Sequence, residues 1–191
     1  MVALSGSLGR YRLPDPPVGE DLVTAVRASL ALPALLPPEV AYPLLAVVYH
    51  APLREMLAGE PPDFVLWLHG PSGTFKSEHA ALAMAHYGDF TRLSLPASFA
   101  ATANAVERIC SAAKDALVVV DDYHPASDAR EQTAMATVAS RLLRGVDNGA
   151  GRARMRADTS LRPELTPRGV VLVTGERLPD GLPRLSGLSP S

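Results

Sequence analysis

The sequence predicts an α/β protein whose strands form a mostly parallel sheet in a three-layer core. Three short apolar runs support this, at residues 64–68, 116–120 and 169–173. Uninterrupted apolar runs of this length are typical of strands that a parallel sheet buries on both faces. Segments with helical spacing lie between the runs, and this alternation of strand and helix indicates an α/β fold.

Composition supports a soluble globular protein. The 191 residues suffice for one domain, or one domain and an appendage. Hydrophobic residues make up 47% and charged residues 20%, which excludes a disordered chain. The net charge of −2 gives no overall basic field for nucleic acid or membrane. No apolar run approaches the ~20 residues of a membrane span, and the first 17 residues do not resemble a signal peptide. We therefore expect a cytoplasmic protein without a membrane partner.

The N-terminal part is expected to be helical. Residues 1–18 are rich in Gly, Ser and Pro and are predicted to form a flexible lead-in. Residues 20–32 carry apolar side chains at helical spacing, and a second helix is predicted over 39–53, weakened by Pro43. We interpret residues 19–58 as a helical appendage that packs on the following core.

The core is predicted to comprise residues 61–191. After the first apolar run, the spacing predicts helices over 77–87 and 98–113, with a short strand at 92–95 between them. Asp128 and Glu131 have the spacing of a capping box and are expected to open a further helix. Gly145 is expected near the end of that helix. The single cysteine, Cys110, is expected in the core and leaves no disulfide within the chain.

The strongest motif lies between the first predicted strand and the helix after it. A loop in this position can bind a polyphosphate through backbone N–H groups and the N-terminus of the helix. Lys76 would contact the β- and γ-phosphates of ATP, and it is one of only two lysines beside 16 arginines. Ser77 would offer its hydroxyl to Mg²⁺. The predicted nucleotide-binding residues are Gly70, Pro71, Ser72, Gly73, Thr74, Phe75, Lys76 and Ser77.

The loop departs from the usual phosphate-loop pattern at one position. Gly70 and Gly73 are expected to supply unusual dihedrals and a close approach to phosphate. Phe75 stands where a glycine usually precedes the lysine. Because a bulky residue resists a positive φ, we expect the chain to turn differently there. The alternative is an ordinary Gly/Pro/Ser turn before a helix, in which case the position of Lys76 is a coincidence.

Two carboxylates follow the second apolar run, as in a Walker B motif. Asp121 is predicted to hold Mg²⁺, through water, together with Ser77. Asp122 is predicted to be catalytic and to orient or deprotonate the attacking water. The alternative is a strand that ends in a polar turn, where Asp is common.

A polar residue also follows the third apolar run. Thr174 is the candidate for contacting the γ-phosphate or the attacking water, which would make it a second catalytic residue. Thr-Gly is also an ordinary turn, and a capped strand end explains it equally well.

Basic charge gathers between the second and third runs. Residues 141–168 contain seven arginines and three acids, so this segment carries +4 and the rest of the chain −6. If the chain is extended there, Arg152, Arg154 and Arg156 lie on one face. They are the predicted nucleic-acid contacts, through phosphate and without sequence preference. The alternative is a solvated loop in an arginine-biased protein.

Taken together, the stretch from about residue 14 to 179 resembles helicase-like P-loop ATPases of bacterial plasmids, phages and integrative elements. That resemblance implies a RecA/AAA-like P-loop NTPase core, ATP and Mg²⁺ as ligands, and a role in replication or transfer of a mobile element. The segments that carry it are the 70–77 loop with Phe75, the 116–122 strand, the arginine-rich 149–156 stretch and residues 173–176.

The expected function is therefore Mg²⁺-dependent ATP hydrolysis by a helicase-like protein, a homo-oligomer that binds nucleic acid. Such ATPases continue beyond the third strand, whereas this sequence ends soon after, so we expect a core truncated at the C-terminus. Arg177 and Arg184 are then the arginines left to reach a neighbouring subunit's nucleotide. A small-molecule or nucleoside kinase, and a module that binds ATP without hydrolysing it, remain as alternatives.

Overall fold

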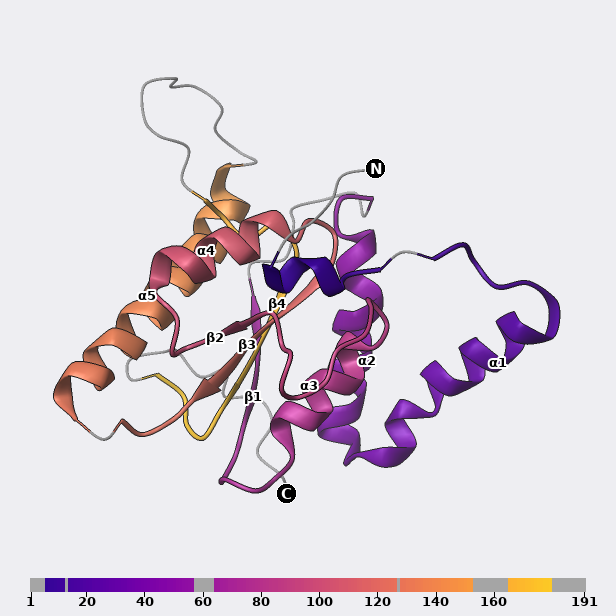
Figure 1. The fold of residues 1–191 in the computed structure, drawn as a ribbon, viewed down its shortest axis with the longest axis horizontal. Helices are drawn as coiled ribbons and strands as arrows, with labels where there is room; N and C mark the ends of the chain where they lie inside the picture. Colours follow the sequence, from indigo (N-terminus) through magenta and orange to yellow (C-terminus); the bar gives the residue numbers. More distant parts are fainter. Residues whose placement is uncertain (1–5, 13, 57–63, 127, 153–164, 180–191) are drawn as a thin grey trace.

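The computed structural model describes residues 6–12, 14–56, 64–126, 128–152 and 165–179. These contain five α-helices, two 3₁₀ helices and four strands (Figure 1). In chain order the elements are η1 (Gly6–Arg10), α1 (Gly19–Leu30), η2 (Leu32–Leu35), α2 (Pro38–Leu53), β1 (Val65–His69), α3 (Lys76–Met84), β2 (Ala97–Ser98), α4 (Ala103–Ala112), β3 (Leu117–Tyr123), α5 (Ala129–Arg152) and β4 (Val170–Gly175).

The four strands form one parallel sheet in the order β1-β4-β3-β2. The three apolar runs form three adjacent strands of this sheet, β1, β4 and β3, which confirms the predicted α/β class and parallel sheet. Because all four strands run the same way, their carboxyl ends and the loops that follow them meet at one edge.

Side chains alternate between the two faces of the sheet, and helices cover both. Leu117 and Val119 of β3 join a cluster with α2 and α3, whereas Val118 and Val120 join a cluster with α4 and α5. Figure 1 shows the two pairs of helices on opposite sides of the sheet. The described residues thus form three layers, as the sequence predicts.

The short strand predicted after α3 lies elsewhere than expected. Residues 92–95 form a turn, in which the backbone N–H of Ser94 donates to Thr91 O at 2.9 Å. The strand is instead β2, which pairs with Val120 and Asp121 of β3. Because Ser98 belongs to this strand, α4 begins five residues later than predicted, at Ala103.

Helix α5 opens as predicted but continues further. Asp128 Oδ1 accepts a hydrogen bond of 2.8 Å from the backbone N–H of Glu131, which confirms the cap. The helix passes Gly145 and ends at Arg152, so the predicted end is wrong. Gly145 instead serves close packing, because a Cβ there would lie 3.1 Å from Cδ of Pro167.

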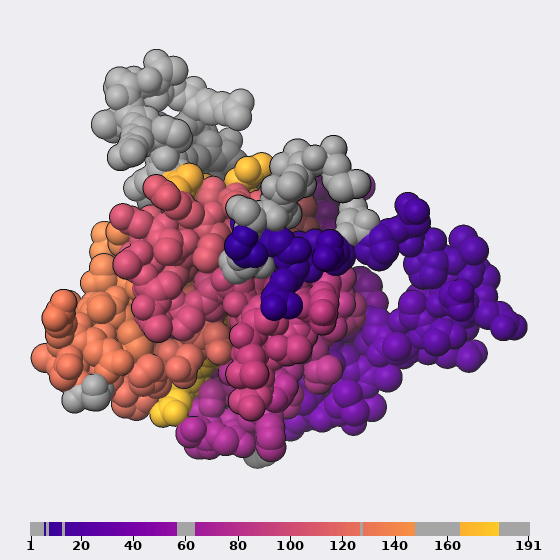
Figure 2. Space-filling model, viewed as in Figure 1, coloured from indigo at the N-terminus to yellow at the C-terminus, as the bar shows by residue number. Residues whose placement is uncertain are grey.

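The two predicted N-terminal helices differ in burial. Helix α2 is a layer of the core, with Leu44, Val47 and Val48 buried against the sheet, and it continues through Pro43. Helix α1 buries none of its residues and stands out at one side of the molecule (Figure 2). Within the lead-in, the Tyr11 hydroxyl donates to Leu117 O at 2.8 Å. No helix in the described ranges is long and apolar enough to cross a membrane.

Candidate functional site

The loop of residues 70–75 lies at the carboxyl edge of the sheet, between β1 and α3. The backbone N–H of Gly70 donates to Gly175 O at 3.2 Å, which ties the loop to the end of β4. Inside the loop, the Thr74 hydroxyl donates to Pro71 O at 2.8 Å. The loop therefore has a defined shape and opens directly into the first turn of α3.

The backbone at Phe75 corrects one expectation. Phe75 has φ 58° and ψ 24°, the left-handed conformation, so the loop makes the turn that a glycine would make there. The residue is 70% exposed, so its side chain is not packed in the core. Gly73 also has a positive φ, of 81°, as expected. Gly70 does not, and a Cβ there would only reach ordinary contact with Thr74 Oγ1, at 3.5 Å.

Lys76, the first residue of α3, folds back over the loop. Its Nζ donates to Gly70 O at 2.9 Å and to Pro71 O at 2.7 Å, and lies 3.3 Å from Thr74 Oγ1. The ammonium group is thus held by neutral oxygen acceptors at the mouth of the loop. An anionic oxygen would be a stronger acceptor for the same group.

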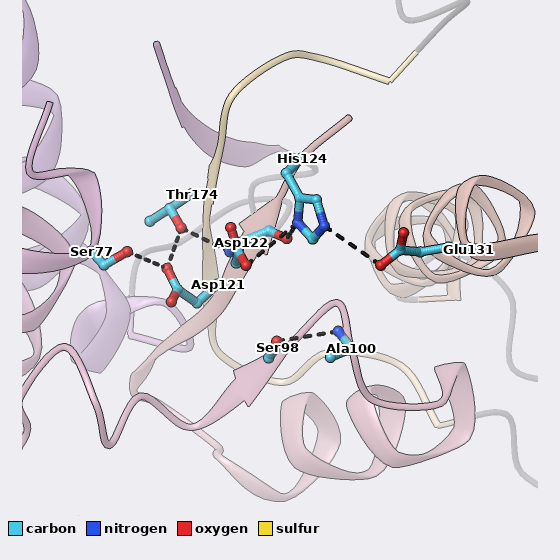
Figure 3. Close-up of polar contacts among 8 residues, drawn as sticks. All are labelled: Ser77, Ser98, Ala100, Asp121, Asp122, His124, Glu131 and Thr174. Atoms are coloured by element: carbon cyan, nitrogen blue, oxygen red, sulfur yellow. Dashed lines mark hydrogen bonds and ion pairs between the residues drawn. The ribbon is translucent and has the colours of Figure 1, made fainter. Parts of the chain in front are cut away.

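The structure brings Ser77, Asp121 and Thr174 together from three elements (Figure 3). Oδ1 of Asp121 accepts a hydrogen bond of 2.8 Å from the Ser77 hydroxyl and another from the Thr174 hydroxyl. Strand order explains this, because β4 lies between β1 and β3 and all three strands end at the same edge. Thr174 is almost fully buried, with 1% of its surface exposed.

The two carboxylates of β3 point in different directions. At Asp122 the strand bulges, with φ 71° and a shift in the register with β4. The Asp122 side chain is 64% exposed, and its backbone N–H donates to Thr174 Oγ1 at 3.1 Å. Asp121 is therefore engaged by hydroxyl groups inside the site, while the Asp122 carboxylate reaches solvent.

His124 joins the site beside Asp122, although it was not among the site residues predicted from the sequence. Its Nδ1 donates to Asp122 O at 3.0 Å and lies 3.4 Å from Asp122 Oδ2, and its Nε2 lies 3.6 Å from Glu131 Oε1. Burial alone would lower the pKa of His124. The bond to Asp122 O and the charges of Asp122 and Glu131 outweigh it and raise the pKa. Its position two residues after the acid pair was the signal available in the sequence.

Other predicted residues lie outside this cluster. Arg177, which follows β4, donates to Gln132 Oε1 on α5. Arg152 is the last residue of α5, so the expectation of an extended chain is wrong at this residue. The reason is that the helix does not stop at Gly145. Arg154, Arg156 and Arg184 lie outside the described residues.

The oxygen donors of the site fit a magnesium ion. Mg²⁺ prefers hard oxygen ligands and usually takes one or two from protein and the others from phosphate and water. The Ser77 hydroxyl and the Asp121 carboxylate are such donors and already lie 2.8 Å apart. The described residues contain no group of three or more His, Cys, Asp or Glu side chains arranged to hold a metal.

Comparison with known proteins places this chain in a family. Searches of curated proteins and of solved structures give no significant match. One family model matches residues 46–164, which is more than half of the chain. The matched range extends from α2 through the 70–77 loop and the acid pair to α5 and beyond. The chain belongs to the family described as a domain of unknown function (DUF927).

Proposed function

We propose that this protein is a P-loop NTPase that binds ATP with Mg²⁺ at the 70–77 loop and hydrolyses it. The observation that carries the proposal is the hydrogen bond of 2.8 Å between the Ser77 hydroxyl and Asp121 Oδ1. These residues are 44 positions apart, yet they meet beside a loop that contains Lys76. A phosphate loop beside a carboxylate at the end of another strand of the same sheet is the arrangement that nucleotide-dependent phosphoryl transfer uses.

Phosphate binding would use the loop backbone and Lys76. The loop precedes the N-terminus of α3, where backbone N–H groups and the helix dipole favour negative charge. Lys76 would exchange its contacts with Gly70 O and Pro71 O for anionic phosphate oxygens. Such charge-assisted hydrogen bonds are about twice as strong as neutral ones, so the exchange favours the bound state.

Asp121 and Asp122 would have separate roles. Ser77 and Asp121 would hold Mg²⁺, which neutralises charge on the phosphates. Asp122, with its carboxylate open to solvent, would accept a proton from the attacking water. The water oxygen then bonds to the γ-phosphorus, the bond from that phosphorus to the bridging oxygen breaks, and ADP leaves.

Beyond ATP hydrolysis, we propose the more specific role of a helicase-like protein in a mobile element. It is supported by the resemblance described above and by the +4 charge of residues 141–168 in a chain of net charge −2. Nucleic acid would be bound through phosphate contacts without sequence preference. A cytoplasmic homo-oligomer is proposed on the same resemblance.

The test is to measure ATP affinity by calorimetry and phosphate release with and without Mg²⁺ and DNA. Asp122→Asn should bind ATP with unchanged affinity and hydrolyse it at least ~100-fold more slowly, the low end for loss of a general base. Asp121→Asn should instead raise the Mg²⁺ concentration needed for turnover. Asp147→Asn, at an exposed position of α5, is the matched control.

Three outcomes would contradict this proposal in different ways. Normal hydrolysis by Asp122→Asn would remove the assigned roles of the two acids. Turnover that depends on a small phosphate acceptor would indicate a kinase. ATP binding without turnover under every condition would indicate a binding module.

A further inference from the structure

His124 connects two elements of the site, the end of β3 and the first turn of α5 (Figure 3). Its ring lies between Asp122 of β3 and Glu131 in the first turn of α5. The Asp128 cap fixes that first turn, so Glu131 extends from a well-defined position. Through its two ring nitrogens, His124 therefore bridges Asp122, at the bulge of β3, and Glu131, in the first turn of α5.

Asp122 needs such a support if it is to act on a water molecule. Its backbone is in the left-handed conformation and its side chain is mostly exposed, so an unsupported carboxylate would sample several rotamers. A general base is efficient only when it is held within hydrogen-bond reach of its proton. His124 contacts both the carbonyl and the carboxylate of Asp122, which restrains the backbone and the side chain together.

We propose that His124 is a positioning residue, which orients the Asp122 carboxylate by bridging it to Glu131 of α5. The inference rests on the proposed ATP hydrolysis and assigns that site one further residue. His124 itself would touch neither ATP nor the attacking water, and would act through Asp122 alone.

The geometry favours the protonated ring. Asp122 O can only accept a hydrogen bond, so Nδ1 carries a proton, while Nε2 faces the Glu131 carboxylate, which also accepts. Both nitrogens are therefore best satisfied in the imidazolium form. Among described residues, Asp122 and Glu131 are the charges that act on His124. Arg177, beyond β4, donates a hydrogen bond to Gln132 of the same helix.

The direction of the pH effect follows from the raised pKa of His124. A group with a raised folded pKa contributes its interaction fully below its unfolded pKa of ~6.5 and loses it as pH rises through the folded value. The bridge should therefore weaken on the alkaline side. The rate of ATP turnover should therefore fall as pH rises through the pKa of His124.

The first test needs no nucleotide. The imidazole of His124 is titrated by NMR in the wild type and in Asp122→Asn and Glu131→Gln. The pKa of His124 should lie above ~6.5 and should fall in both variants. An ordinary pKa that neither substitution changes would overturn the bridge.

The second test measures turnover. His124→Ala should lower kcat by ~10- to 100-fold, the cost of a misplaced catalytic group, with KM for ATP unchanged. His124→Asn retains a donor for Asp122 O and should recover part of kcat, but it should lose the alkaline limb of the pH profile. His86→Gln should match the wild type.

These tests separate the two proposals. If the wild type turns over ATP and His124→Ala keeps its kcat and pH profile, His124 is not a positioning residue and the ATPase proposal stands. If the wild type shows no turnover, the ATPase proposal and the catalytic part of the inference both fall. The NMR titration still decides in that case whether His124 bridges Asp122 and Glu131.

Discussion

The hydroxyl of Thr174 lies between the two carboxylate residues of β3 and bonds to both. It donates to Oδ1 of Asp121 and accepts from the backbone N–H of Asp122 at 3.1 Å. Thr174 is buried at the end of β4, so one side chain sets both the orientation of Asp121 and the bulge at Asp122. In this arrangement it supports the two acids rather than facing solvent.

Replacing Thr174 by Val should therefore destabilise the protein. The substitution keeps the shape of the side chain but leaves the Asp122 N–H and an Asp121 oxygen without this partner, at a cost of about 1–3 kcal/mol. Urea unfolding followed by circular dichroism measures it. Thr174→Ser keeps the hydroxyl and should lose less, as should Thr133→Val on the exposed side of α5. Equal stability of Thr174→Val and wild type would show that these hydrogen bonds contribute nothing net.

Phe75→Gly should stabilise the folded protein. A residue with a Cβ in the left-handed conformation loses about 1–2 kcal/mol of folding stability, which glycine would recover. Glycine also has a more flexible unfolded state, and this offsets about 0.5–1 kcal/mol of that recovery. A net gain of about 0.5–1 kcal/mol is expected in the same urea assay. Leu93→Gly, at an exposed residue whose φ is not positive, should give no gain. A loss of stability in Phe75→Gly would show that the exposed ring contributes contacts.

Lys76→Ala should weaken ATP binding at least ~10-fold. One charge-assisted contact to phosphate contributes about 1.5–3 kcal/mol, and this lysine lies at the mouth of the loop. Calorimetry with Mg²⁺-ATP measures the change. Lys114→Ala is the matched control, because Lys114 pairs with Glu55, 2.7 Å away, and takes no part in the loop. If both variants bind ATP like the wild type, the nucleotide site is assigned to the wrong residues.

Replacing Arg152, Arg154 and Arg156 together by Ala should reduce the salt dependence of nucleic-acid binding. Losing three phosphate contacts would flatten the slope of log K against log salt by up to ~2.7 for duplex DNA and ~2.1 for single strands. Fluorescence anisotropy at several salt concentrations measures the slope, and ATP affinity should stay constant.

Two results would contradict that arginine assignment. A collapse of ATP affinity in the triple variant would mean that the arginines serve the nucleotide, as a lid or a subunit finger would. Wild-type protein without salt-dependent binding to nucleic acid would mean that the segment is a solvated loop.

Three of the four described strands and the N-cap of α5 could be predicted because their signals are local. A short apolar run identifies a strand buried on both faces, and the capping residue Asp128 identifies the start of α5. The short edge strand could not be predicted, because two residues such as Ala97 and Ser98 carry no periodicity. The end of α5 was predicted wrongly because a glycine can either end a helix or allow close packing within it. Only the close approach of Pro167 to Gly145 in the structure distinguishes the two.

The sequence by itself determined the α/β class and the parallel sheet, and it predicted Lys76, Ser77, Asp121 and Asp122 as candidate groups at the loop after β1. Tertiary structure alone decided that β4 lies between β1 and β3, which brings Ser77, Asp121 and Thr174 into one hydrogen-bonded cluster. It also decided the left-handed turn at Phe75 and the bridge from Asp122 through His124 to Glu131. The physical reason is that periodicity and capping act within a few residues, whereas strand order and these side-chain contacts depend on packing between segments far apart in the chain.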